Sequence, residues 1–209
     1  MRSIPMWGRL GLAALLCVAF IALIAAKPSE APAFPVVKII VNGGHGSGAN
    51  LGGGYILTAG HVSEDAGAVT VMTPDGIQHE GEVLWSNHGP GSYDVSLVYV
   101  HSLRDTDGAD LSCEVPKLGQ EIVILGNPKM SNWIKTWGRV ANPDIGPSAF
   151  NLWRQIIVLD ATATNGNSGG PVLDAKTGEI VGILVGGYPG TGITFMVPGK
   201  TLCHLLGRV

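Results

Sequence analysis

The feature that most constrains this fold is a succession of short apolar runs separated by turn residues. The runs are rich in Val, Ile and Leu, and Gly, Pro, Asn or Asp interrupts them. Many short strands with turn signals at intervals of about 8–12 residues are typical of β-sandwiches and barrels. We therefore predict an all-β fold of about a dozen strands. The expected strands cover residues 36–41, 55–58, 69–73, 78–84, 94–100, 121–125, 133–140, 155–159, 171–173, 180–185 and 193–197.

The segments between these runs give three further predictions. Residues 42–54 contain repeated glycines and are expected to form a loop. That loop lacks the Gly-Lys-Ser/Thr ending of a phosphate-binding loop, so no nucleotide site is expected. Residues 74–76 (Pro-Asp-Gly) predict the turn of a hairpin. After Pro198, leucines recur at helical spacing, which predicts a short amphipathic helix at the C-terminus.

The first 35 residues are expected to lie outside this fold. Two arginines precede residues 10–26, an apolar run of 17 residues. This is the pattern of a secretory signal, although the run is shorter than the roughly 20 residues of a spanning helix. A cleaved signal peptide and an uncleaved membrane anchor, giving attachment through residues 10–26, both stay open. Either one exports the domain, and residues 27–35 form a Pro-rich tether.

Charge and cysteine content exclude some functions. Arg2 and Arg9 lie in the leader, so the rest of the chain carries 11 basic and 16 acidic residues, a net charge of −5. No basic stripe is present, and nucleic acid is not an expected partner. Outside the leader the cysteines are Cys113 and Cys203, and their sequence positions leave open whether they form a disulfide. Neither has metal-type spacing with a histidine, and we expect no metal or cofactor.

A serine lies between glycines in residues 165–171 (Asn-Gly-Asn-Ser-Gly-Gly-Pro). Because glycine adopts backbone angles closed to other residues, the N–H groups of Gly166, Asn167 and Ser168 can face one small volume. An oxyanion formed there would be stabilised by about 3–4 kcal/mol per donor. We predict that Ser168 is a nucleophile beside this oxyanion hole. The local alternative is a glycine-rich hairpin with an incidental serine.

Nucleophilic serine catalysis also needs a base and a carboxylate that orients the base. His61 follows the predicted strand 55–58, and Asp94 opens the predicted strand 94–100. A histidine can take the serine proton and return it to the leaving group, and a buried carboxylate fixes the histidine tautomer. We predict a triad of His61, Asp94 and Ser168. This order differs from the orders in subtilisin and the α/β-hydrolases.

Three short boxes resemble those of trypsin-like serine peptidases. Residues 57–62 (Leu-Thr-Ala-Gly-His-Val) resemble the family's Leu-Thr-Ala-Ala-His-Cys box, and residues 94–97 (Asp-Val-Ser-Leu) its Asp-Ile-Ala-Leu box. Residues 166–171 resemble its Gly-Asp-Ser-Gly-Gly-Pro box. The resemblance implies a chymotrypsin-type fold of two perpendicular six-stranded β-barrels with a short C-terminal helix, formed by residues 36–209. The motif form is closest to bacterial HtrA-like peptidases, here without their PDZ domain.

The resemblance implies an exported serine endopeptidase that cuts a protein or peptide substrate through a covalent acyl-enzyme. Asn167 stands where the animal digestive enzymes have an aspartate that pairs with a new N-terminus, so that mode of zymogen activation is not expected. Two other functions stay open. One is a pseudo-enzyme that binds peptides without cutting them, and the other is an esterase using the same triad.

By the same resemblance, the floor of the primary specificity pocket lies six residues before the nucleophile, at Thr162. Its walls are assigned to Val185, Gly186, Gly187 and Gly192, with no charge at the floor. A shift of two residues in this alignment would place Asp160 at the floor instead. The five other histidines are interpreted as surface or loop residues, and Trp133, Trp137 and Trp153 as packing residues.

Overall fold

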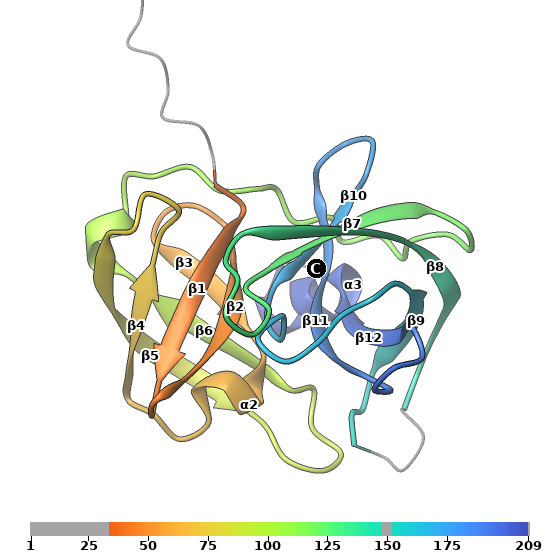
Figure 1. The fold of residues 1–209 in the computed structure, drawn as a ribbon, viewed down its shortest axis with the longest axis horizontal. Coiled ribbons are helices and arrows are strands. Elements are labelled where there is room, and N and C mark those ends of the chain that lie inside the picture. The colour runs from red at the N-terminus through yellow and green to blue at the C-terminus, as the bar shows by residue number, and fades with distance from the viewer. Residues whose placement is uncertain (1–33, 148–151, 209) are drawn as a thin grey trace, which may run out of the picture. The chain divides into compact units, whose positions relative to one another are not determined.

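The computed structural model describes residues 34–147 and 152–208, which form two closed six-stranded β-barrels (Figure 1). The predicted all-β class and the two barrels are confirmed. The predicted signal or anchor and most of the tether fall on residues 1–33, outside the described ranges. Within those ranges, no helix is long and apolar enough to cross a membrane.

The first barrel holds six antiparallel strands in the order β1-β2-β3-β6-β5-β4. A one-turn helix α2 (Gly60–Ser63) follows β3, and a 3₁₀ turn η1 (His101–Leu103) follows β6. The strands are β1 (Val36–Val41), β2 (Gly44–Asn50), β3 (Tyr55–Thr58), β4 (Ala68–Met72), β5 (Gln78–Asn87) and β6 (Val95–Tyr99).

The prediction that residues 42–54 form a loop is wrong, because Gly44–Asn50 pairs with both β1 and β3. The glycines serve close packing there. A Cβ on Gly46 would lie 2.6 Å from the Val62 side chain, and one on Gly48 would lie 2.6 Å from Ile56. Glycine normally weakens strands. In β2 its small size lets neighbouring chain segments approach this strand.

The second barrel repeats the topology of the first, since its order β10-β11-β12-β9-β8-β7 is the same pattern read in reverse. The predicted closing helix is confirmed as α3 (Gly199–Leu205), which contacts β11 and β12. The strands are β7 (Glu121–Gly126), β8 (Ile134–Gly146), β9 (Ile156–Asp160), β10 (Pro171–Asp174), β11 (Ile180–Gly187) and β12 (Ile193–Pro198).

Each barrel encloses an apolar cluster, and a third cluster joins the two barrels. The third cluster includes Leu57 and Leu97 from the first barrel and Ile183 and Phe195 from the second. A disulfide between Cys113 and Cys203 ties the connection between the barrels to α3. In the loop-entropy treatment, a cross-link between residues about 90 positions apart lowers the entropy of the unfolded chain and so raises its free energy by roughly 4–5 kcal/mol. We call the interface formed by this third cluster the seam. The seam and the disulfide hold together the two barrels from which the site is built.

Candidate active site

The predicted triad residues come from both barrels and meet at the seam. His61 lies in α2, directly after β3, and Asp94 directly precedes β6. Ser168 lies in the β9–β10 connection of the second barrel. The backbone O of Ser168 accepts a hydrogen bond from the N–H of Ser47 in β2, at 2.8 Å. The nucleophile loop is therefore docked against the first barrel, which carries the other two residues.

His61 and Asp94 form a doubly bonded pair. The imidazole Nδ1 lies 2.7 Å from Asp94 Oδ2, and the backbone N–H of His61 donates to Asp94 Oδ1 at 2.8 Å. Because an ionised carboxylate only accepts, Nδ1 carries the proton and Nε2 presents its lone pair. Asp94 has a φ of +57°, in the left-handed region where aspartate is tolerated. The pair holds the histidine in the tautomer that a general base requires.

Asp94 accepts a third hydrogen bond, from the indole N–H of Trp153 to Oδ2 at 2.9 Å. Only 4% of the Asp94 side chain is exposed, so these donors replace the water that the carboxylate loses on burial. A buried charge without such partners would cost several kcal/mol. The interpretation of Trp153 as a packing residue is therefore incomplete, since its indole N–H also donates a hydrogen bond to the candidate acid, Asp94.

His61 and Ser168 line one hollow at the seam, of about 550 Å³. Within the described ranges, no hydrogen bond joins their side chains, and the imidazole is 44% exposed. Such contacts are often long before substrate binds and shorten in the complex. His45, expected to be a surface or loop residue, lines the same hollow, and its Nε2 lies 2.9 Å from the backbone O of Asn127.

The backbone before Ser168 forms a tight turn. The N–H of Asn167 donates to Thr164 O at 3.1 Å, and Gly166 at the third position has a φ of +96°, as in a type II turn. A Cβ on Gly166 would lie 2.3 Å from the backbone O of Asn127, so only glycine fits. The O of Asn165 accepts from the N–H of Lys129 at 2.9 Å. Since a trans peptide places its N–H opposite its C=O, the N–H of Gly166 points away from Lys129.

The two N–H groups that flank Asn167 have no acceptor among the described residues. Among the described residues, those of Gly166 and Ser168 donate to no protein acceptor, and both residues line the hollow with His61. The prediction for Asn167 needs correction, because its N–H is used inside the turn. The candidate oxyanion hole is therefore a pair of donors, on Gly166 and Ser168.

A buried serine of the first barrel holds the turn in this conformation. Ser47 is fully buried, and its Oγ donates to the O of Gly166 at 2.8 Å. The backbone N–H of Asn127 donates to the same Oγ at 2.9 Å. The buried Asn167 packs its side chain against Gly126, where a Cβ would lie 2.3 Å from Oδ1. These neutral contacts support a turn that lacks the aspartate ion pair of the digestive enzymes.

A second hollow of about 330 Å³ also has Ser168 in its lining. Val185, Gly186 and Gly187, which the sequence assigned to the pocket walls, line this hollow. Its other described lining residues are Trp153, Ala163, Thr164, Asn165, Leu184, Tyr188, Pro189 and Gly190, none of which is charged.

Two predicted pocket residues do not line this hollow. Thr162 is exposed and faces a separate hollow that it shares with Asp160 and Trp137. Gly192 instead accepts the N–H of Ala161 through its backbone O. At the end of β9, Asp160 pairs with both β8 and β12, and it lines the same separate hollow as Thr162. Asp160, the alternative floor residue, does not line the hollow beside Ser168 either.

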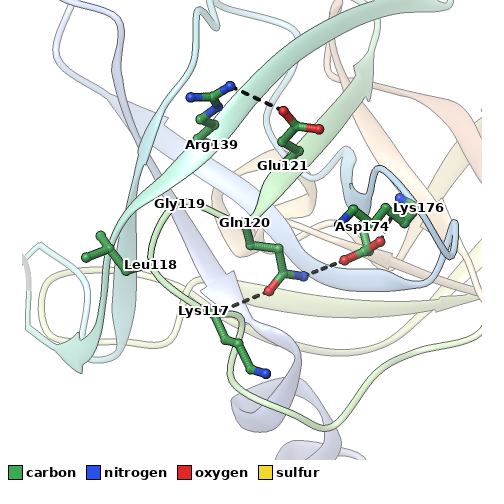
Figure 2. A pocket seen from close by; sticks show the side chains of 8 residues that line it. All are labelled: Lys117, Leu118, Gly119, Gln120, Glu121, Arg139, Asp174 and Lys176. Atoms are coloured by element: carbon green, nitrogen blue, oxygen red, sulfur yellow. Dashed lines mark hydrogen bonds and ion pairs between the residues drawn. The ribbon is translucent and has the colours of Figure 1, made fainter.

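Another hollow, of about 650 Å³, lies elsewhere on the second barrel, around the start of β7 (Figure 2). Arg139 pairs with Glu121 at 3.2 Å, and Gln120 donates to Asp174 at 2.6 Å. A hydrogen bond from the backbone N–H of Thr177 lowers the pKa of Asp174. The eight lining residues include no serine, cysteine or histidine, so this hollow does not offer the nucleophile chemistry of the seam.

Comparisons with known proteins agree with the fold and the motifs. The model of the trypsin-like peptidase domain family matches residues 46–183. The periplasmic pH-dependent serine endoprotease DegQ of Escherichia coli is 30% identical over 166 residues, which are 75% of this chain and 35% of DegQ. A probable periplasmic serine endoprotease, DegP-like, of Buchnera aphidicola is 28% identical over 163 residues, covering 75% and 34%. The chain spans about a third of the length of these relatives.

Among solved structures, the serine endoprotease from Yersinia pestis has a TM-score of 0.70 and 23% identity. The superposition covers 83% of this chain and 62% of that one. This likeness supports the fold described above.

Proposed function

The chain belongs to the family of trypsin-like peptidase domains, and from this premise we propose that it is a serine endopeptidase of the HtrA type. The observation that carries the proposal is the convergence at one hollow of three features. These are the His61–Asp94 pair, the side chain of Ser168, and the two backbone N–H groups beside it. That set contains the base, nucleophile and oxyanion donors of acyl transfer.

The proposed reaction proceeds in two halves. Ser168 Oγ attacks the scissile carbonyl carbon while His61 Nε2 takes the hydroxyl proton. The carbonyl oxygen becomes an oxyanion, which accepts hydrogen bonds from the N–H groups of Gly166 and Ser168. The C–N bond then breaks, and the amine leaves with the proton held by His61. The first half leaves Ser168 Oγ acylated as an ester. A water molecule then attacks the ester carbon while His61 takes its proton. The C–O bond to Ser168 breaks, the acid product leaves, and His61 returns the proton to Ser168 Oγ. Asp94 stays ionised and stabilises the imidazolium.

A fluorophosphonate probe combined with peptide and ester substrates tests this proposal. We expect the folded domain to be labelled on Ser168 and to cleave peptides internally. A folded domain that binds peptides but takes no label would instead be a pseudo-enzyme. Hydrolysis of simple esters without peptide cleavage would indicate an esterase.

We also propose that the domain acts outside the cytoplasm. The support is the leader-like pattern of residues 1–26 and the periplasmic naming of the relatives. Residues 27–35 would be the tether and residues 36–209 the peptidase domain. Mass spectrometry of the mature N-terminus separates a cleaved signal from a retained anchor, and a cytoplasmic location of the domain would refute export.

The pocket beside Ser168 predicts a preference for an uncharged residue before the scissile bond, aliphatic or small. None of the described residues that line this pocket is charged, so a buried Arg or Lys of the substrate would lack a partner, at a cost of several kcal/mol. The backbone of Val185–Gly187 can pair with the extended substrate. Peptides that differ only at this position, as Val, Ala, Leu, Phe, Glu or Arg, measure the preference through kcat/KM. A tenfold advantage for Arg would refute the pocket assignment.

Ser47→Ala is expected to lower both stability and rate. It removes the hydroxyl that donates to Gly166 O and accepts from Asn127, which leaves buried groups unpaired at a cost of about 1–3 kcal/mol. With the turn less fixed, we expect kcat to fall about tenfold, less than the roughly 10²–10³-fold cost of losing one oxyanion donor outright. Thermal unfolding and steady-state kinetics measure the two effects.

The matched control is Ser96→Ala, another fully buried serine of the first barrel, bonded to Ser63 and Ser86 and not to the nucleophile loop. It should lower stability with little change in kcat. An equal loss of kcat in both variants would show that Ser47 has no specific link to the turn.

A further inference from the structure

Trp153 joins the second barrel to the loop that carries Asp94. It lies just before β9 and forms an isolated bridge with Ser92. The next residue, Arg154, donates its backbone N–H to the O of Ser92 at 2.7 Å, and its guanidinium lies over the ring of Tyr93. Ser92 in turn accepts the N–H of Asp94 through its Oγ. The backbone of Trp153 is therefore fixed to the residues that set the position of Asp94.

The indole N–H of Trp153 reaches the same carboxylate oxygen as His61. Oδ2 of Asp94 receives His61 Nδ1 at 2.7 Å and Trp153 Nε1 at 2.9 Å, while Oδ1 receives the backbone N–H of His61. Two donors on Oδ2 and one on Oδ1 determine how the carboxylate plane is rotated. Indole is a donor only, so it supports the ionised acid without competing for the proton of His61.

The ring of Trp153 forms part of the pocket wall beside Ser168. It covers Gly186, where an added Cβ would lie 2.5 Å from Cη2 of the indole. The ring packs against Phe195 at a centroid distance of 5.6 Å, and Phe195 contacts Tyr188 edge-on at 5.0 Å. Because Gly186 has no side chain, the indole from another segment occupies the space in front of β11.

We propose that Trp153 is a positioning residue for Asp94 and also a specificity-determining wall of the substrate pocket. Its N–H orients the acid of the triad, and its ring contacts the substrate. One rigid side chain thereby connects the occupied pocket to the hydrogen bond that holds His61. This inference rests on the proposed peptidase function and adds a residue that the three sequence boxes do not include.

The test separates the N–H from the ring. Trp153→Phe removes the donor and keeps an aromatic wall, so we expect kcat to fall about tenfold, a typical coupling between contacting residues, with KM within about twofold. Trp153→Ala removes both, so KM should rise as well. The matched control is Trp137→Phe, since Trp137 on β8 is 67% exposed and lines neither hollow at Ser168. It should leave both constants unchanged.

Two further measurements test whether Trp153 acts through Asp94. In an Asp94→Asn background, Trp153→Phe should cause no further loss in the rate of fluorophosphonate labelling, because the group that it positions is already altered. The indole N–H resonance of Trp153, identified by its loss in Trp153→Phe, should shift in Asp94→Asn. Wild-type kcat in Trp153→Phe, or an unchanged resonance, would refute the proposal.

The resonance needs no catalytic activity, so the two proposals can fail separately. A domain without Ser168-dependent hydrolysis overturns the peptidase function, while the resonance still reports the contact. If Trp153→Phe unfolds the domain, Gly186→Ala is the second variant. Its Cβ displaces the ring from β11, and it should lower kcat in the same way. Wild-type kcat in a folded Gly186→Ala variant would then refute the proposed positioning role of Trp153.

Discussion

Ser168→Ala is expected to abolish peptide hydrolysis while leaving the fold intact. Removing the nucleophile of a serine peptidase with this triad costs about 10⁶-fold in kcat. The Ser168 side chain makes no hydrogen bond among the described residues, and its backbone O keeps the bond from Ser47. Stability should therefore change by no more than about 0.5 kcal/mol. Steady-state hydrolysis measures kcat, fluorophosphonate labelling measures the reactivity of the nucleophile, and thermal unfolding measures stability.

Ser102→Ala is the matched control, because Ser102 Oγ lies 2.8 Å from His79 Nδ1 but is not part of the nucleophile loop. It should keep full activity. If Ser168→Ala retains activity within tenfold of the wild type, Ser168 is not the nucleophile. Loss of activity in Ser102→Ala would contradict the assignment, because it would point to the Ser102–His79 pair instead of Ser168 and His61.

Asp94→Asn should fold and lose about 10⁴-fold in kcat, the effect of this change in a serine peptidase with the same triad. Three N–H groups face the Asp94 carboxylate, and an amide offers one oxygen and two donors. The amide NH₂ therefore meets a donor, and His61 is driven to the tautomer with the proton on Nε2. That nitrogen can then no longer accept the proton of Ser168. Measuring kcat at neutral pH gives the size of the loss.

Asp65→Asn is the control for this change. Asp65 is the aspartate nearest to His61 in the sequence, but its side chain is 96% exposed and lies 3.8 Å from His88 Nε2. The Asp65 variant should keep the wild-type rate. A near-normal rate in Asp94→Asn together with a loss in Asp65→Asn would reverse the assignment of the acid.

Most of the strands could be predicted from the sequence, because alternation and turn residues act over a few neighbouring positions. The strand Gly44–Asn50 could not, since its glycines read as loop signals. They lie in a strand because Val62 and Ile56 approach it closely, and these contacts exist only after the barrel closes. The disulfide was left open for the same reason, as its two cysteines are 90 residues apart.

The identity of the candidate triad was determined by the sequence alone, because each residue lies in a short box whose local chemistry is readable. His61 and Asp94 are brought together by the pairing of β3 with β6, and Ser168 lies beside His61 at the same hollow. The number of oxyanion donors could not be predicted from the sequence. Whether the N–H of Asn167 is free depends on the direction of each peptide in the turn.

Only the tertiary structure decided which residues support the site. Ser47 contacts Gly166 across 119 positions, and Trp153 contacts Asp94 across 59. No local propensity encodes these contacts. They arise where the two barrels pack together, and their hydrogen bonds satisfy polar groups that become buried only when that seam forms.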